Sequence, residues 1–270
     1  MTNFPYELVA IDVDDTLLND EKEITKKTKQ TILNLKNKDV LVTLASGRPY
    51  HSLKSYAKEL EINLPLITAN GGLIKDKNRT YKKITFPKKL LIEIFNKTKK
   101  EEYIISIYYE DTIYTTSEKM QDIHRELKEV ENIKYIKTID GLNLKDPIKI
   151  LLHHKSIKKI KNGFDDFFIN YGEKLHITRA SEDSIEISNL KANKGDGIKF
   201  LARYLKIPIN KTMVIGNGLN DVPMFKEAGL SVAMANSSEE VKAEADAITA
   251  SNNEEGVHKA LNQKLLLNVK

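Results

Sequence analysis

Short apolar runs alternate with amphipathic segments over the first eighty residues of the chain, which is typical of strands followed by helices. The predicted strands are residues 6–11, 40–45 and 65–69, and the predicted helices are residues 25–36 and 49–59. In the first helix, Ile32 and Leu35 are spaced to share one buried face. Strands that alternate with helices in this way predict a parallel sheet with helices on its faces.

The pattern changes after about residue 86 and becomes a mixture of strands and helices. The predicted elements are a helix from 87 to about 100, a hairpin of 104–109 and 112–116 that turns at Glu110 and Asp111, a strand at 147–153, a helix at 157–168, and strands at 175–178 and 184–188. This α+β block of roughly a hundred residues is large enough to form a separate small domain.

The simple alternation resumes at Lys194 and continues toward the end of the chain. Its predicted helices are 195–205, 221–228 and 238–245, and its predicted strands are 212–215 and 230–233. We therefore predict an α/β protein with a Rossmann-like, doubly wound parallel sheet that is split by an inserted α+β domain. The expected boundaries are residues 1–85 and 190–270 for the core and residues 86–189 for the insertion.

Length and composition indicate a globular protein rather than a membrane or secreted one. The chain has 270 residues, of which 40% are hydrophobic and 30% are charged, enough for a sizeable buried core. No apolar run approaches the roughly 18 to 20 residues that span a bilayer, and acidic residues from Asp12 onward interrupt any signal-like N-terminal segment. Without cysteine, neither disulfides nor thiolate metal sites can form. We expect a cytoplasmic protein with no membrane partner.

The net charge of +5 does not indicate nucleic-acid binding, because the basic residues are mostly lysines interleaved with acids. Residues 21–23 show this mixture, with Lys22 between two glutamates. Arginine, which reads phosphates and bases better than lysine does, occurs at only five positions. We expect no nucleic-acid partner.

Three carboxylates, Asp12, Asp14 and Asp15, follow the apolar run 8–11 directly. Such crowding at a strand end is costly unless a cation compensates the charge. On a strand, Asp12 and Asp14 would point to the same side because side chains alternate. Two carboxylates aimed at one point predict a Mg²⁺ site and, beyond it, a phosphate.

Three further polar clusters stand at junctions between predicted strands and helices. They are Ser46-Gly47-Arg48, Lys194-Gly195, and the segment from Gly216 to Asp221 that contains Asn217 and Asn220. In doubly wound sheets, ligands bind beyond the carboxyl ends of the strands, where these clusters can meet. Each cluster alone is common, but four in this order at the right junctions are hard to assign to chance.

The chemistry of phosphoryl transfer gives each cluster a role. Asp12 would be the nucleophile that forms an aspartyl-phosphate, and Asp14 would protonate the leaving oxygen and later deprotonate water. Ser46 can donate a hydrogen bond to a phosphate oxygen, and Lys194 adds a cation that holds the phosphate beside the nucleophile. Asp221 would complete a metal site with Asp12 and the Asp14 backbone carbonyl, since Mg²⁺ offsets the repulsion between a carboxylate and a phosphate dianion.

These four clusters resemble the motifs of the haloacid dehalogenase-like hydrolase superfamily, across essentially the whole chain. The likeness is closest to the Cof-type phosphatase branch, in which a large α/β cap lies between the second and third motifs. Further matches are Ala69-Asn70-Gly71-Gly72, the segment Ala228 to Met234, and Asn253 with Gly256 and Val257. The resemblance implies a Mg²⁺-dependent phosphatase of small phosphorylated metabolites such as sugar phosphates, with a cap that closes over the core.

The resemblance also implies the residues of the site. The substrate contacts would come from Thr16, Gly47, Arg48, Asn70, Gly71 and Asn220. The metal ligands would be Asp12, Asp14, Asn217 and Asp221.

The chain departs from the family pattern at two positions. Asp15 stands where the family often has glycine, a change that a turn can tolerate. Asn217 stands where the family usually has an aspartate that ligates the metal. An amide oxygen can still bind Mg²⁺ but brings no negative charge, which predicts weaker binding. Alternatively, Asp221 and a water suffice.

Other classes of protein share parts of this sequence pattern. An EF-hand loop at residues 12–23 is disfavoured because Leu17 replaces the required glycine and a strand precedes it. A receiver domain would be much shorter, with its phosphorylated aspartate after the third strand. A phosphomutase of the same superfamily stays open, as does a non-hydrolytic protein that binds a phosphorylated ligand if Asn217 disables the metal site. We expect a monomer or a weak homo-oligomer.

Overall fold

The computed structural model describes residues 4–127 and 129–262. The chain divides into two compact units. The core unit contains the residues up to Arg48, residues Leu53–Tyr81 and the residues from Asn193 onward, and the inserted unit contains Pro49–Ser52 and Lys82–Ala192. The role of the inserted unit as a cap, with the boundaries expected from the sequence, stays a prediction.

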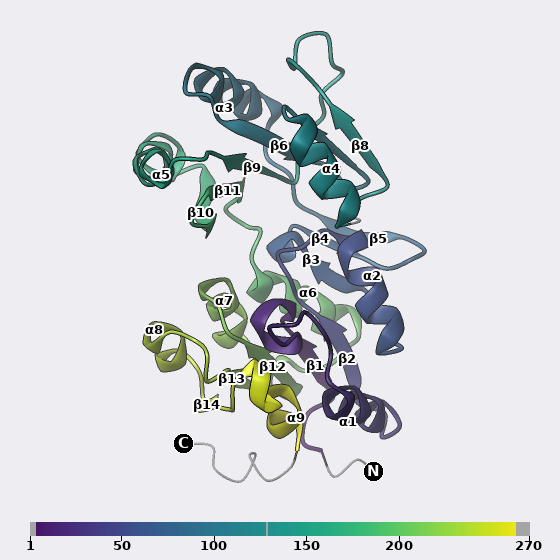
Figure 1. Ribbon diagram of the computed structural model, residues 1–270. Helices are drawn as coiled ribbons and strands as arrows, with labels where there is room; N and C mark the ends of the chain where they lie inside the picture. The colour runs from purple at the N-terminus through teal and green to yellow at the C-terminus, as the bar shows by residue number, and fades with distance from the viewer. Residues whose placement is uncertain (1–3, 128, 263–270) are drawn as a thin grey trace. The chain divides into compact units, whose positions relative to one another are not determined.

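A five-stranded sheet in the order β14-β13-β12-β1-β2 forms the centre of the core unit (Figure 1). Its strands are β1 (Leu8–Ile11), β2 (Leu41–Leu44), β12 (Thr212–Gly216), β13 (Leu230–Ala233) and β14 (Ala247–Ile248). All four pairings are parallel. Because β1 lies between β12 and β2, the residue that follows it stands in the middle of the sheet's carboxyl edge.

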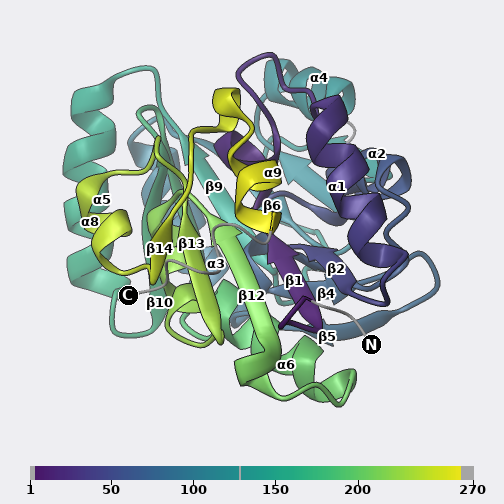
Figure 2. The same cartoon turned by 90° about the horizontal axis from the view of Figure 1, so that it is seen from below.

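Helices cover both faces of this sheet (Figure 2). They are α1 (Lys26–Lys36), α2 (Tyr50–Glu59), α6 (Lys194–Tyr204), α7 (Val222–Phe225), α8 (Glu239–Ala243) and α9 (Gly256–Leu261). Leu8 and Ala10 of β1 pack with Ile198 of α6 and Met224 of α7 in one apolar cluster. Helices α1 and α9 contact each other and lie on the other face. Burial of β1 on both faces explains its unbroken apolar sequence and confirms the predicted fold class.

Two details of the core unit differ from the sequence-based expectation. Strand β3 (Leu66–Thr68) is joined to the parallel sheet by an isolated bridge between Ala45 and Ile67 rather than by a full strand pairing. It pairs instead in an antiparallel hairpin with β4 (Leu73–Lys75), followed by β5 (Thr80–Lys83), neither of which was predicted. Helix α7 ends at Phe225, three residues before the predicted end of 221–228, and a 3₁₀ turn, Leu219–Asp221, precedes it.

The inserted unit is built on a six-stranded sheet in the order β10-β11-β9-β6-β7-β8. Its elements are α3 (Lys88–Lys100), β6 (Ile104–Tyr108), β7 (Thr112–Thr115), α4 (Glu118–Glu126), β8 (Asn132–Tyr135), β9 (Lys149–His153), α5 (Ile157–Tyr171), β10 (Leu175–Ser181) and β11 (Ser184–Asn189). The predicted hairpin is the antiparallel pair β6–β7. No helix in the described part of the chain is long and apolar enough to span a membrane.

One face of this second sheet packs against α3 and α5 through apolar side chains that include Leu91, Ile107 and Phe167. Helix α4 and strand β8 were not predicted from the sequence. Helix α4 is mostly polar, and His124 is its one buried residue among those described. Only Met120 and Ile123 among its nine residues are apolar, too few to indicate this helix from the sequence.

His124 joins a buried polar network in the inserted unit. Its Nε2 lies 2.9 Å from Ser106 Oγ, and its Nδ1 lies 2.6 Å from Glu129 Oε2. Tyr108 also donates its hydroxyl to Glu129 Oε2 at 3.2 Å. Burial raises the pKa of Glu129, but the close contact and charge of His124 outweigh burial and lower this pKa below its usual value.

We predict that Glu129→Gln lowers the free energy of unfolding at pH 7 by about 1–3 kcal/mol. Because the pKa of Glu129 is lower in the folded state, its charged form stabilises the fold above the ordinary value of 4.5. This stabilisation is lost as the pH falls through the folded-state pKa. Urea unfolding at pH 7 and pH 4 measures the effect, with the exposed Glu126→Gln as the control. The same loss at both pH values would contradict the prediction.

Candidate active site

Asp12 stands at the carboxyl end of β1, in the middle of the parallel sheet. Its backbone N–H donates to the carbonyl of Ile215 in β12 at 2.9 Å, so the residue still follows the neighbouring strand. Its side chain is buried, with 5% of the residue exposed. The backbone pairing with β12 therefore places Asp12 at this edge of the sheet.

Asp14 does not lie on the strand, so the expectation that it points to the same side as Asp12 through strand alternation was wrong. The chain turns at Val13–Leu17, where Leu17 N–H bonds to the Asp12 carbonyl at 3.2 Å and Asp15 has a left-handed φ of 55°. The Asp14 carboxylate instead faces Arg48. Arg48 Nε donates to Oδ2 at 2.9 Å and Nη2 to Oδ1 at 2.6 Å.

Lys194 connects two carboxylates from different strand ends. Its Nζ donates to Asp12 Oδ1 and to Asp221 Oδ1, each at 2.6 Å. The Asp221 Oδ2 atom accepts the backbone N–H groups of Asn217 and Gly218, both at 2.9 Å. Lys194 is the first residue of α6, and its side chain is completely buried. The motifs after β1 and β12 and at the start of α6 therefore meet at one ammonium group.

Burial determines the electrostatics of Asp12, Asp221 and Lys194. It raises the pKa of Asp12 to about 7, with a further contribution from Asp221 and opposition from Lys194. Burial alone would lower the pKa of Lys194, but the two carboxylates raise it well above its usual value. Lys194 is therefore a cation, and one cation faces two carboxylates in a buried site.

Two glycines allow the close approaches that the site needs. A Cβ at Gly216 would lie 2.4 Å from Asp221 Cγ, so only glycine lets this carboxylate pack against the end of β12. Gly71 has a φ of +86°, and a Cβ there would lie 2.2 Å from the backbone oxygen of Asn193. Asn193 caps α6 by accepting the Asp196 N–H, which fixes where Lys194 begins the helix.

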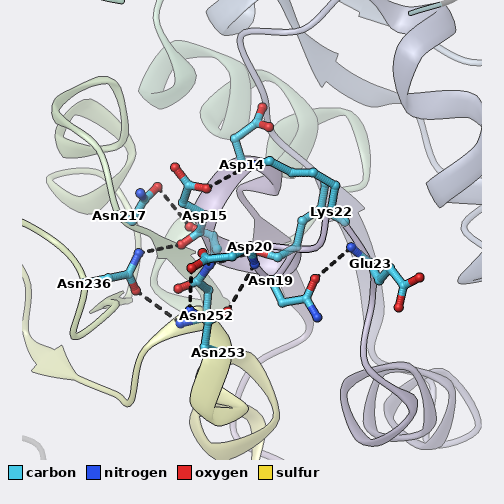
Figure 3. Close-up of polar contacts among 12 residues, drawn as sticks. Asp14, Asp15, Asn19, Asp20, Lys22, Glu23, Asn217, Asn236, Asn252 and Asn253 are labelled. Carbon is cyan, nitrogen blue, oxygen red and sulfur yellow. Dashed lines mark hydrogen bonds and ion pairs between the residues drawn. The ribbon is translucent and has the colours of Figure 1, made fainter.

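The remaining predicted residues form contacts in the same unit. Thr16 Oγ1 donates to Asn217 Oδ1 at 3.1 Å, so this amide oxygen faces the turn after β1 (Figure 3). Asn220 Nδ2 donates to Asn70 Oδ1 at 3.0 Å.

The segment after β2 is ordered by its own polar groups. Ser46 is buried and its Oγ accepts the Arg48 backbone N–H at 3.1 Å. At Gly47, an added Cβ would lie 3.1 Å from Asn70 Oδ1, so the backbone passes close to that amide. The roles of these residues in substrate binding stay predictions.

The donor set fits Mg²⁺. Asp12 and Asp221 share a single cation, so the buried site carries an excess of negative charge, and its oxygens are hard ligands. Among the described residues, no group of three or more histidine, cysteine, aspartate or glutamate side chains is placed to hold a metal. Mg²⁺ commonly binds through one or two carboxylates together with water and phosphate oxygens. Asp12, Asp221, the Asp14 carbonyl and the Asn217 amide can supply the protein ligands.

Three asparagines that order the elements around the site were not identified from the sequence: Asn193, Asn236 and Asn252. Asn193 caps α6, a role that its position three residues before Asp196 could have indicated. Asn236 donates to the Asp15 carbonyl, and Asn252 to the Leu18 carbonyl (Figure 3). For Asn252, the only available signal was the capping pattern of Ser251 and Glu254 around it.

Comparison with known proteins shows one family. A model of the haloacid dehalogenase-like hydrolases matches residues 9–261. The phosphatase YwpJ of Bacillus subtilis is 29% identical over 278 residues, covering 93% of this chain and 97% of that protein. The 5-amino-6-(5-phospho-D-ribitylamino)uracil phosphatase YcsE of the same organism is 30% identical, with 96% of each chain covered.

A solved structure agrees with these matches over the whole fold. The crystal structure of a haloacid dehalogenase-like hydrolase from Bacteroides thetaiotaomicron superposes with a TM-score of 0.84 at 26% identity. The alignment covers 95% of this chain and 98% of that one. The likeness extends through both units, so it is not confined to the common parallel sheet.

We predict that Lys194→Met lowers the free energy of unfolding by about 3–5 kcal/mol, because two buried carboxylates then face each other without a cation. Adding Asp221→Asn should recover part of this loss, since one of the two charges is removed. Urea unfolding at pH 7 measures both variants. The control is Lys199→Met, a partly exposed position on the same helix. An equal loss in the single and double variants would contradict the electrostatic explanation.

Proposed function

Because this chain belongs to the haloacid dehalogenase-like hydrolase family and is a phosphoric monoester hydrolase, we propose that it hydrolyses its substrate through an aspartyl-phosphate on Asp12 with Mg²⁺ as cofactor. The observation that carries the proposal is the placement of Lys194 between Asp12 and Asp221 at the carboxyl edge of the sheet. In this proposal Asp12 is the nucleophile, Lys194 is the cation that binds the phosphate, and Asp221 is a second carboxylate for the metal. The three side chains meet in one buried site.

In the first half of the proposed reaction, an Asp12 oxygen attacks phosphorus and the bond to the leaving oxygen breaks. Asp14 gives that oxygen its proton. In the second half, Asp14 takes a proton from water, and the water oxygen attacks the phosphorus of the aspartyl-phosphate. Inorganic phosphate leaves and Asp12 is restored. Bound Mg²⁺ would offset the repulsion between phosphate and carboxylate and polarise the phosphoryl group.

The neighbouring side chains support these steps. Lys194 holds positive charge beside the attacking carboxylate, and Ser46 is placed to donate to a phosphate oxygen. Arg48 binds both Asp14 carboxylate oxygens, and this half-buried ion pair has to open before Asp14 can reach a leaving group. A phosphate dianion that attracts Arg48 would release Asp14 at the moment it is needed.

We propose small phosphorylated metabolites, sugar phosphates in particular, as substrates. The relative YcsE is named for a substrate with a phosphorylated ribityl chain, a polyhydroxylated group of this kind. In this proposal residues 86–189 form a cap that excludes water and contacts the leaving group, over a core of residues 1–85 and 190–270. The composition supports a cytoplasmic location. Nucleic acid is not an expected partner, and a monomer or weak homo-oligomer stays a prediction.

We predict that Asp12→Asn abolishes phosphate release, because an amide cannot act as the nucleophile. The assay follows phosphate released from an aryl phosphate and from a panel of phosphorylated metabolites, with Mg²⁺ and with a chelator. Wild-type release should require Mg²⁺. The matched control is Asp39→Asn, a surface position outside the site.

The same assay separates the alternatives. Isomerisation of a phosphorylated metabolite without net phosphate release would indicate a phosphomutase. Ligand binding with no turnover would indicate a non-hydrolytic binding protein. Either result would contradict the proposed hydrolysis, as would full activity in Asp12→Asn.

We predict that Asn217→Asp tightens Mg²⁺ binding by about tenfold or more, because a carboxylate adds a negative charge to the ligand set. Isothermal titration of Mg²⁺ into the substrate-free protein measures this directly. Asn220→Asp, three residues further along the same loop, is the control for a general increase in negative charge. Equal affinities in the wild type and Asn217→Asp would argue against a ligand role for residue 217.

A further inference from the structure

Val13, Leu17 and Leu18 bury the first part of the loop that carries Asp14, but its acidic side chains and its second part reach the surface. Asp14 and Asp15 side chains are 44% and 51% exposed, and residues 20–23 are exposed as well. Residues 20–23 lack such buried anchors, and a segment of this kind would normally sample many conformations. Polar contacts are therefore what can hold this part of the loop, and Figure 3 shows where they lie.

Asp20 is held by two asparagines from the last part of the described chain. Asn252 Nδ2 donates to Asp20 Oδ1 at 3.1 Å, and Asn253 Nδ2 donates to Asp20 Oδ2 at 2.9 Å. Asn253 Oδ1 also accepts the Asp20 backbone N–H at 3.1 Å. These amide hydrogen bonds lower the pKa of Asp20. The loop is thereby joined to the 3₁₀ turn Asn252–Glu254, more than two hundred residues away in sequence.

A second point of attachment lies nearer Asp14. Asn236 Nδ2 donates to the Asp15 carbonyl at 2.8 Å, at the residue with the left-handed backbone. Asn236 Oδ1 in turn accepts the Asn252 backbone N–H at 3.2 Å. Asn252 also donates to the Leu18 carbonyl at 3.2 Å. One connected set of amides therefore holds the loop on both sides of its turn.

We infer that Asn236, Asn252 and Asn253 form an amide clamp that holds the loop of residues 13–23 and so positions Asp14 for proton transfer. The three are positioning residues, since none of them contacts Asp14 itself in the interactions described. The inference rests on the proposed function for the role of Asp14. It adds a catalytic dependence on residues outside the four motif clusters.

The chemistry of the contacts favours a clamp over a cation site. The amide N–H groups of Asn252 and Asn253 point at the Asp20 carboxylate and satisfy it with donors. A cation on Asp20 would have to displace these donors. Two amide oxygens of the set are also occupied, because Asn253 Oδ1 accepts the Asp20 backbone N–H and Asn236 Oδ1 accepts the Asn252 backbone N–H.

The test exchanges donor and acceptor between two residues. Asn253→Asp places two carboxylates against each other and removes the Nδ2 donor, so the clamp should open. Combining it with Asp20→Asn restores a carboxylate–amide pair in the reverse direction. The asparagine at position 20 can still accept from Asn252 while donating to residue 253. Asn34→Asp is the control, because this exposed amide on α1 accepts from Gln30 through an oxygen that aspartate retains.

Hydrogen exchange and steady-state kinetics provide the two readouts. Asn253→Asp should speed exchange of the loop amides and lower kcat by about tenfold or more, with KM within about twofold, because the proton donor and not the phosphate site is displaced. The double variant should recover both quantities, and Asn34→Asp should change neither. Urea unfolding of each variant confirms that the fold is retained.

Unchanged loop exchange in Asn253→Asp would overturn the inference, and so would faster exchange without a fall in kcat. A double variant that recovers neither quantity would also contradict it. If the wild type itself releases no phosphate, the proposed function has failed. Loop exchange in the single and double variants would then still decide whether the clamp exists.

Discussion

The site depends on one buried interaction, the Lys194 ammonium group between the carboxylates of Asp12 and Asp221. It joins a helix start to two strand ends, one of them 182 residues away in sequence. Removing three charged groups from water is costly, and the cost is offset only because each is paired at 2.6 Å. Three features bring these groups together: the register of the sheet, the close approach allowed by Gly216, and the N-cap residue Asn193 at the start of α6. The excess negative charge that remains is what a divalent cation would neutralise.

The two aspartates of the first motif are supported in different ways. Asp12 follows the central strand directly, and its carboxylate is paired with Lys194 in a buried site. Asp14 stands on the turn that follows, where Arg48 binds both of its carboxylate oxygens and, in our inference, amides from the segment after β13 position the loop. This division suits the proposed chemistry, in which the nucleophile stays fixed while the proton carrier moves between a leaving group and water.

The sequence predicted the elements with strong apolar periodicity and the motifs that follow them. Runs such as residues 6–11 must be buried, so their strands and the carboxyl edge they share could be inferred. The orientation of Asp14 could not, because alternation assumes that the strand continues to Asp14, whereas the chain turns from Val13 onward. Helix α4 was missed because only two of its nine residues are apolar. The asparagines at 236 and 252 were missed because an amide's partner depends on tertiary contacts that no local pattern encodes.

The central claim is that phosphate passes through a covalent bond to Asp12. Rapid acid quenching during turnover, followed by proteolysis and mass spectrometry, would locate that bond. The account predicts a transient phosphoryl group on the peptide that contains Asp12, absent when Mg²⁺ is removed. Phosphate release with the label on another residue, or with no labelled peptide at any reaction time, would contradict it.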